Sequence, residues 1–111
     1  MLRATRSKVL VSQDGTFVSR ALFPFEGQRK VQFYELRLAP GGVETAEADS
    51  PGTLANLVVS RGTVEIGIEG KRHLLDTGDA ILFEADVVYS CRNPCEVETL
   101  MYLVIVYVDP V

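Results

Sequence analysis

The residues of this chain that could do chemistry are two carboxylates, a tyrosine and a cysteine on short, strand-like segments. Glu47 and Asp49 are two positions apart, so in an extended chain their side chains point to the same side. Tyr89 and Cys91 have the same spacing. Such a set can hydrogen-bond a small ligand, and a carboxylate pair can also move protons. Either use requires that the two pairs face a common interior.

The sequence lacks the combinations of residues that nucleophilic catalysis and tight metal binding usually need. His73 is the single histidine, so neither a Ser-His-Asp nor a Cys-His arrangement is predicted. Cys91 and Cys95 would need two further soft ligands to hold zinc, and we expect two reduced thiols, with a regulatory disulfide as the alternative. Glu47 and Asp49 alone could hold Mg²⁺ or Ca²⁺ only weakly. We therefore expect no metal, no cofactor and no catalytic residue.

The elements that must position these residues are strands, because almost nothing in the sequence follows a helical period. Short blocks rich in Val, Ile, Leu, Phe and Tyr are separated about every ten residues by Gly, Asp, Asn or Pro. This pattern is typical of an all-β sandwich or a closed barrel. The expected strands, including a weakly apolar one at 43–49, cover residues 8–12, 16–20, 31–38, 43–49, 54–60, 63–68, 73–75, 80–84, 87–92 and 97–108.

Length and composition predict one ordinary globular domain over residues 1–111, with 47% hydrophobic and 23% charged residues. The net charge of -4 should repel a phosphate backbone, so this chain alone is not expected to bind nucleic acid. The longest apolar run, residues 100–108, is too short to cross a bilayer, and no secretory signal opens the chain. We expect a cytoplasmic protein with no membrane partner.

The glycines, acidic residues and turns together resemble the paired motifs of the cupin superfamily. The residues that carry the resemblance are Gly41, Glu47, Asp49, Gly62, Gly78, Asp79, Phe83, Ala85, Asp86 and Asn93. Residues 33–41, 50–59 and 78–89 are most similar to the cupin domain that follows a helix-turn-helix in bacterial transcription regulators. The resemblance implies a jelly-roll-like β-barrel, usually dimeric, with a pocket opening between its two sheets.

The sequence departs from that family where metal-binding members carry their histidine and glutamate ligands. The corresponding positions are Glu47, Asp49, Ala55 and Tyr89. Ala55 has no donor atom, and a phenol with a reference pKa near ~10 does not replace a neutral imidazole at pH 7. The resemblance therefore implies a cupin that has lost its metal site.

The resulting hypothesis is a metal-free, small-molecule-sensing and dimerisation cupin domain of a bacterial transcription regulator. It would form a homodimer and contact DNA only through a helix-turn-helix domain that lies outside this chain. The predicted ligand-binding residues are Glu47, Asp49, Leu57, Tyr89 and Cys91.

Two other functions remain open on the sequence alone. One is a small stand-alone cupin enzyme, similar to an isomerase or epimerase, that uses Glu47, Asp49 and Tyr89. The other is an interaction module with a filled barrel, in which Leu57 and Tyr89 are core residues, Cys91 is an inert buried thiol, and the two carboxylates are solvated.

Overall fold

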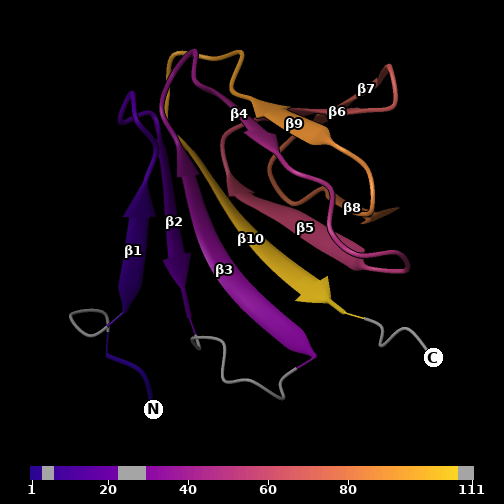
Figure 1. The fold of residues 1–111 in the computed structure, drawn as a ribbon. Coiled ribbons are helices and arrows are strands. Elements are labelled where there is room, and N and C mark those ends of the chain that lie inside the picture. The colour runs from indigo at the N-terminus through magenta and orange to yellow at the C-terminus, as the bar shows by residue number, and fades with distance from the viewer. Residues whose placement is uncertain (4–6, 23–29, 108–111) are drawn as a thin grey trace.

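A computed structural model describes residues 1–3, 7–22 and 30–107, and all regular structure in these ranges is β-strand (Figure 1). The strands are β1 (Lys8–Val11), β2 (Phe17–Ala21), β3 (Val31–Leu38), β4 (Val43–Ala46), β5 (Leu54–Arg61), β6 (Val64–Ile68), β7 (Lys71–Leu75), β8 (Ala80–Glu84), β9 (Tyr89–Arg92) and β10 (Thr99–Val106). The all-β prediction is confirmed, and the predicted strand positions agree apart from their ends. The described part of the chain has no helix long and apolar enough to cross a membrane.

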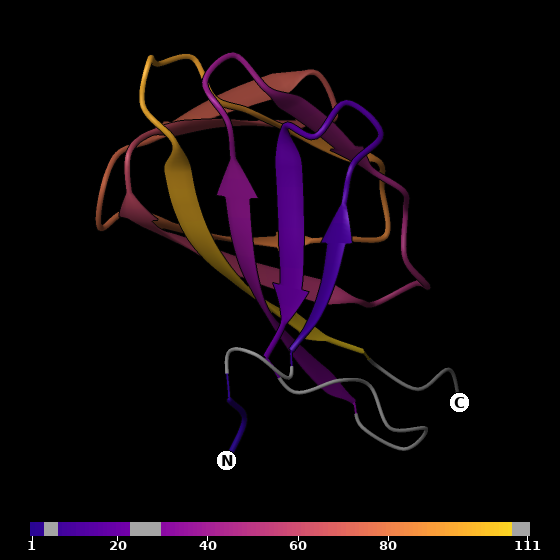
Figure 2. The same cartoon turned by 90° about the vertical axis from the view of Figure 1, so that its left-hand side faces the viewer.

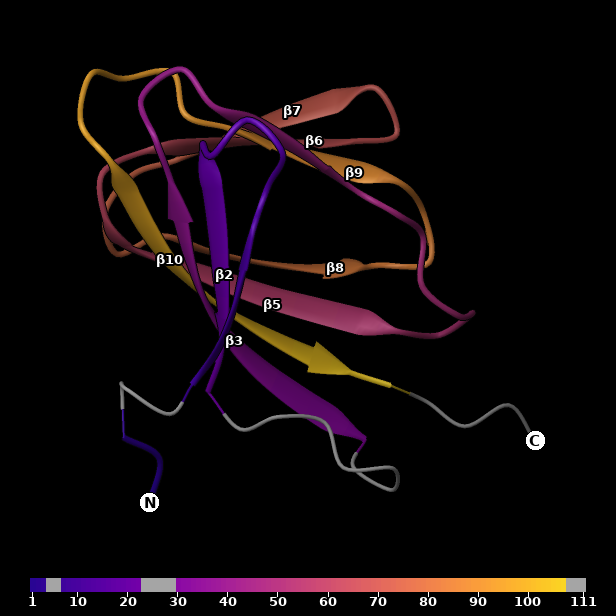
Figure 3. The same ribbon diagram turned by 60° about the vertical axis from the view of Figure 1, so that its left-hand side comes forward.

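Two antiparallel sheets form the two layers of the molecule. The larger sheet has the order β1-β2-β3-β10-β5-β8 and the smaller one the order β4-β9-β6-β7. Figure 3 shows β6, β7 and β9 lying across from β5 and β8, so the sheets enclose the interior between them. β10 pairs with β3 on one side and with β5 on the other. The last strand of the chain therefore completes the centre of the larger sheet.

The core lies between the inner faces of the two sheets, and the two-residue period of each strand decides which side chains enter it. In β3, Leu36 and Leu38 are buried and Tyr34 packs against them, as the alternation in the sequence predicts. The other large, fully buried apolar side chains come from both sheets, and they are Leu57, Val59, Val64, Ile66 and Met101. Figure 2 shows the start of β1 and the end of β10 at the same end of the molecule, away from the turn between β1 and β2 and the turn between β3 and β4.

Two turns named in the sequence hold strands in place through backbone hydrogen bonds. Gly78, at φ +90°, donates its N–H to the Val59 carbonyl at 2.7 Å, and Val59 donates to the Asp79 carbonyl at 3.0 Å. A positive φ of this kind suits glycine because it has no Cβ to clash with the backbone. The Gly-Asp turn thus attaches the start of β8 to β5.

Asn93 joins the turn after β3 to the turn before β10. It is fully buried, and its Nδ2 donates to the carbonyls of Leu38 at 3.0 Å and Val97 at 2.7 Å. Its Oδ1 accepts from the Cys95 N–H at 3.0 Å. The asparagine at this position of the motif is therefore a scaffold residue rather than a ligand-binding one.

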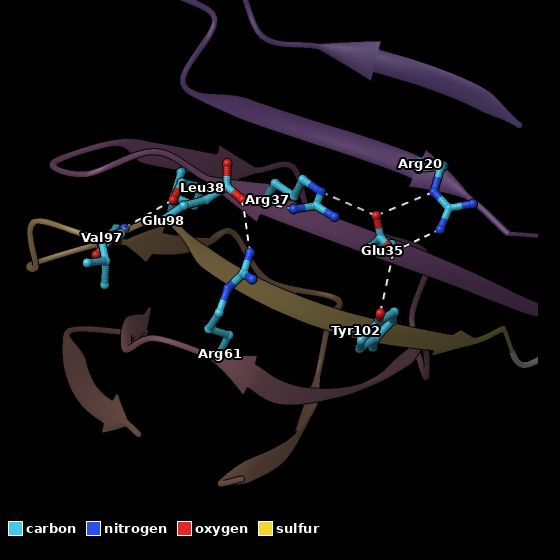
Figure 4. A network of polar contacts seen from close by, with 9 residues as sticks. Arg20, Glu35, Arg37, Leu38, Arg61, Val97, Glu98 and Tyr102 are labelled. Atoms are coloured by element: carbon cyan, nitrogen blue, oxygen red, sulfur yellow. Dashed lines mark hydrogen bonds and ion pairs between the residues drawn. The ribbon is translucent and has the colours of Figure 1, made fainter. Parts of the chain in front are cut away.

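A network of ion pairs and hydrogen bonds around Glu35 covers part of the outer face of the larger sheet (Figure 4). Glu35 points outward from β3, yet it is only 9% exposed because neighbouring side chains surround it. Arg20 donates to its carboxylate at 2.8 Å, the Arg37 Nε lies 3.4 Å from it, and the Tyr102 hydroxyl donates to it at 3.4 Å. The hydrogen bond from Arg20 lowers the pKa of Glu35 more than any other contact.

Candidate ligand-binding cavity

A cavity of about 450 Å³ lies between the two sheets. All five residues predicted to bind a ligand line it: Glu47, Asp49, Leu57, Tyr89 and Cys91. Glu47 is exposed whereas Leu57, Tyr89 and Cys91 are buried, so the cavity leads from the surface into the core. The tertiary structure thus brings together residues from β5, β9 and the segment after β4, and their binding of a ligand stays a prediction.

The deep wall of the cavity is apolar. Leu36, Leu57, Leu103 and Ile105 each lie on the inner face of the larger sheet and are at most 7% exposed. Cavities of several hundred Å³ with apolar walls and a few polar groups are the usual form of small-molecule sites. The space is therefore large enough for an organic molecule of modest size.

Tyr89 is the most buried polar aromatic residue of the cavity, at 6% exposure. Its ring meets Phe83 edge-on, with centroids 4.8 Å apart and an interplanar angle of 71°. Its hydroxyl makes no hydrogen bond with any residue that the structure describes. Burial, followed by the nearby Cys91 and Asp49, raises the pKa of Tyr89, so the phenol is protonated at neutral pH and free to bond a ligand.

Asp49 is held in place by the backbone. Its N–H donates to the Ala85 carbonyl at 2.9 Å, and the Ala85 N–H donates to the Thr53 carbonyl at 2.8 Å. The break between β8 and β9 therefore anchors the segment after β4 at the cavity. Burial raises the pKa of Asp49, because a partly desolvated carboxylate is less stable as an anion.

Cys91 points into the cavity from β9, two residues after Tyr89. Burial, with a smaller contribution from Glu44, raises the pKa of its thiol to about 12. At neutral pH this group is a neutral, weakly polar wall residue rather than a nucleophile. Cys91 and Cys95 are both free, and Cys95 is exposed.

The sequence alone did not assign two tyrosines, Tyr34 and Tyr107, that the fold brings to this site. Tyr34 and Tyr107 line the cavity, and the hydroxyls of both donate to Oε1 of Gln32, from Tyr107 at 3.2 Å. Burial raises the pKa of both phenols, that of Tyr107 to about 12. The alternation of β3 could have identified Tyr34, since it shares a face with Leu36. Tyr107 could not be placed without the pairing of β10 with β3.

The donor atoms at the cavity do not fit the histidine and glutamate metal site that the resemblance to metal-binding cupins implies. Ala55 is fully buried and has no donor atom, and Tyr89 presents a protonated phenol. Within residues 1–3, 7–22 and 30–107, no group of three or more His, Cys, Asp or Glu residues could hold a metal ion. The described residues at this position therefore do not form a metal site.

Comparison with known proteins identifies a matching family and a related transcriptional regulator. A family model described as "Cupin domain" matches residues 34–106. The HTH-type transcriptional regulator SutR of Escherichia coli (strain K12) is 26% identical over 81 residues, which are 73% of this chain and 46% of that protein. This chain thus spans about half the length of that regulator.

Two solved structures share the fold. The cupin domain of an XRE family transcriptional regulator from Enterobacter cloacae superposes with a TM-score of 0.80 at 24% identity, over 85% of this chain and 99% of that one. A predicted oxalate decarboxylase from Thermotoga maritima superposes with a TM-score of 0.72 at 14% identity, over 97% and 99% of the two chains. The same architecture therefore occurs in a regulator domain and in a protein described as an enzyme.

Proposed function

This chain belongs to the cupin domain family, and from that premise we propose that it is the effector-sensing and dimerisation domain of a bacterial transcription regulator. The chain is related to cupin domains of XRE family regulators, which supports this role. DNA would be contacted by a helix-turn-helix domain outside this chain, in keeping with the net charge of -4. We further propose that it acts in the cytoplasm, where a transcription regulator meets its DNA.

The observation that carries the proposal is the Tyr89 hydroxyl, which a largely buried side chain presents to the cavity without a hydrogen-bonding partner among the described residues. The hydroxyl oxygen is not fully enclosed, because no fully buried side-chain polar atom of the described residues lacks a partner, so it is open to a hydrogen-bonding partner in the cavity. A ligand would supply that partner. Its binding energy could then shift the population between two arrangements of the regulator, by no more than its difference in affinity for them.

A thermal-shift screen of small metabolites tests the sensing function. A ligand that binds only the folded state raises the melting temperature by mass action. Leu57→Phe, which fills the cavity, should abolish the shift, whereas Leu74→Phe on the exposed face of β7 should retain it.

In the protein that carries this domain, the ligand should also change the affinity for DNA, measured by fluorescence anisotropy. The proposal fails if no metabolite raises the melting temperature, or if a bound one leaves DNA affinity unchanged.

The proposed dimer surface is the outer face of the larger sheet. Val31, Phe33, Val58, Leu82 and Val106 expose apolar side chains there, from β3, β5, β8 and β10. Symmetric dimers bury the same patch on both copies, so one such face is sufficient. Val58→Asp should convert the dimer to a folded monomer in light-scattering chromatography, whereas Leu74→Asp on the smaller sheet should not. A parent chain that is monomeric at all concentrations would contradict this part.

A metal-free enzyme is the second candidate, because Glu47, Asp49 and Tyr89 do line one cavity. Asp49 is the one group whose raised pKa suits a proton acceptor, while Tyr89 stays protonated at neutral pH and could act only as a donor. An isomerase or epimerase activity that disappears in both Asp49→Asn and Tyr89→Phe would favour this candidate over the sensor.

A further inference from the structure

The charged residues of the cavity all have the same sign. Glu44, Glu47 and Asp49 line it, from β4 and the segment that follows. No lysine, arginine or histidine is among the described residues of the lining. None of the three carboxylates forms an ion pair with a described residue. The potential in the cavity is therefore negative, which favours a cation and repels an anion.

The polar groups near this charge suit an ammonium ion. Tyr89 presents to the cavity a hydroxyl whose oxygen can accept a hydrogen bond, and Tyr34 and Tyr107 lie close enough to Asp49 for its charge to affect their pKa. Tyrosine rings also attract cations through their π faces. Carboxylate, phenol oxygens and aromatic faces together form the environment in which organic ammonium ions are bound.

A bound ammonium ion should stabilise the charged form of Asp49 more than that of the other carboxylates of the cavity. Burial raises the pKa of this carboxyl, and no described cation lies beside it to compensate. A positive charge within a few ångströms would stabilise the carboxylate in the partly desolvated cavity more than it would in water. An anionic ligand would instead add a second unfavourable charge.

The apolar wall restricts the cation to an organic one. Leu57, Leu103 and Ile105 offer no ligand atoms to a hydrated metal ion, but they can cover a hydrocarbon body. The cavity thus has an apolar inner wall and negatively charged residues at its opening.

We propose that the cavity binds a small organic ammonium ion, with its hydrocarbon body on Leu57, Leu103 and Ile105 and its charged nitrogen beside Asp49 and Tyr89. This inference rests on the proposed function of the cavity as an effector site and names the chemical class of the effector.

Three probes of nearly the same shape test the charge directly. Cyclohexylmethylammonium, cyclohexylmethanol and cyclohexanecarboxylate differ mainly in charge, and each is titrated calorimetrically into the complete chain. The ammonium ion is expected to bind about tenfold more tightly than the alcohol, with the carboxylate weakest. Asp49→Asn should remove the preference for the ammonium over the alcohol. Glu84→Gln removes a charge from exposed β8, outside the cavity, and should leave the preference intact; circular dichroism and thermal unfolding check that all variants fold.

The inference is overturned if the alcohol or the carboxylate binds as well as the ammonium, if Asp49→Asn keeps the preference, or if none of the probes binds up to its solubility limit. The proposed function fails in a different way. If the ammonium ion binds with the expected preference but no metabolite of that class changes DNA affinity, the ligand class stands and the regulatory role does not. If a neutral or anionic metabolite controls DNA affinity, the regulatory role stands and the ligand class does not.

Discussion

The ring of Phe83 meets the ring of Tyr89 edge-on, at a centroid distance of 4.8 Å. The contact links the inner face of β8 in the larger sheet with the inner face of β9 in the smaller one. The contact involves the aromatic ring of Tyr89 and does not use its hydroxyl, which can therefore face the cavity. Ring position and hydroxyl function can therefore be separated by mutation.

Tyr89→Phe should leave stability nearly unchanged while weakening ligand binding. The variant keeps the edge-on contact and removes a hydroxyl that has no hydrogen bond to a described residue, so the free energy of unfolding should change by less than about 1 kcal/mol. Urea unfolding without ligand, followed by calorimetric titration with cyclohexylmethylammonium, measures the two effects. A large loss of stability would mean that the hydroxyl is structurally bonded.

Asn93→Ala should be among the most destabilising single substitutions. It removes the donor to the Leu38 and Val97 carbonyls and the acceptor for the Cys95 N–H, at a fully buried position. Leaving such groups unsatisfied should cost about 3 kcal/mol in the free energy of unfolding. Asn56→Ala, at an exposed position of β5, is the control and should cost less than about 0.5 kcal/mol. Equal costs would show that the buried amide is not holding the two turns.

Glu35 should make stability depend on pH in the acid range. Its pKa is lowered in the folded state, chiefly by the hydrogen bond from Arg20. Its contribution is therefore fully present above the unfolded-state pKa of about 4.3, and it is lost as pH falls through the folded-state pKa. Glu35→Gln should be less stable than the parent at neutral pH, and the difference should shrink toward about pH 3.

Urea midpoints measured across this range test the Glu35 prediction. Glu84→Gln, at an exposed position, serves as the control for removal of one negative charge. A gap between parent and Glu35→Gln that is constant with pH would contradict the role of the carboxylate in the network of Figure 4.

Alanine substitutions at Gly62 and Gly70 should separate the destabilisation caused by backbone strain from that caused by steric crowding. Both have positive φ, +87° and +80°. A Cβ on Gly70 would meet nothing within 4 Å, whereas one on Gly62 would lie 3.1 Å from the backbone of Glu98 and of Thr99. Gly70→Ala should therefore cost about 1 kcal/mol, and Gly62→Ala about 3 kcal/mol. Chemical denaturation of both variants measures the difference, and equal losses would rule out the crowding at Gly62.

Thiol labelling should distinguish the two cysteines. Burial raises the pKa of Cys91 to about 12, whereas Cys95 is exposed. Iodoacetamide at neutral pH should modify Cys95 alone in the folded protein and both residues in denaturant, as counted by mass spectrometry. Cys95→Ser should abolish labelling of the folded protein. Rapid modification of Cys91 would show that the cavity opens further than the structure indicates.

Much of the fold could be predicted because β-strand patterning is local. The two-residue period assigns Leu36 and Leu38 to the core, and the glycines and Asn93 mark the turns between strands. The same period places Glu35 on the outer face, but it does not predict that the residue is buried there. That burial arises from Arg20 and Tyr102, which approach from the neighbouring strands β2 and β10.

The sequence by itself determined the all-β architecture, and its motifs carried the resemblance to the cupin family, because both depend on residue type and spacing along the chain. Only the tertiary structure decided the character of the cavity. Asp49, Tyr89 and Tyr107 come from three distant segments, and they line one cavity because the sheet that contains β4 and β9 packs against the sheet that contains β10. Charge and hydrogen bonding act through space, so the negative, cation-free lining that the described residues form appears only once those strands are in register.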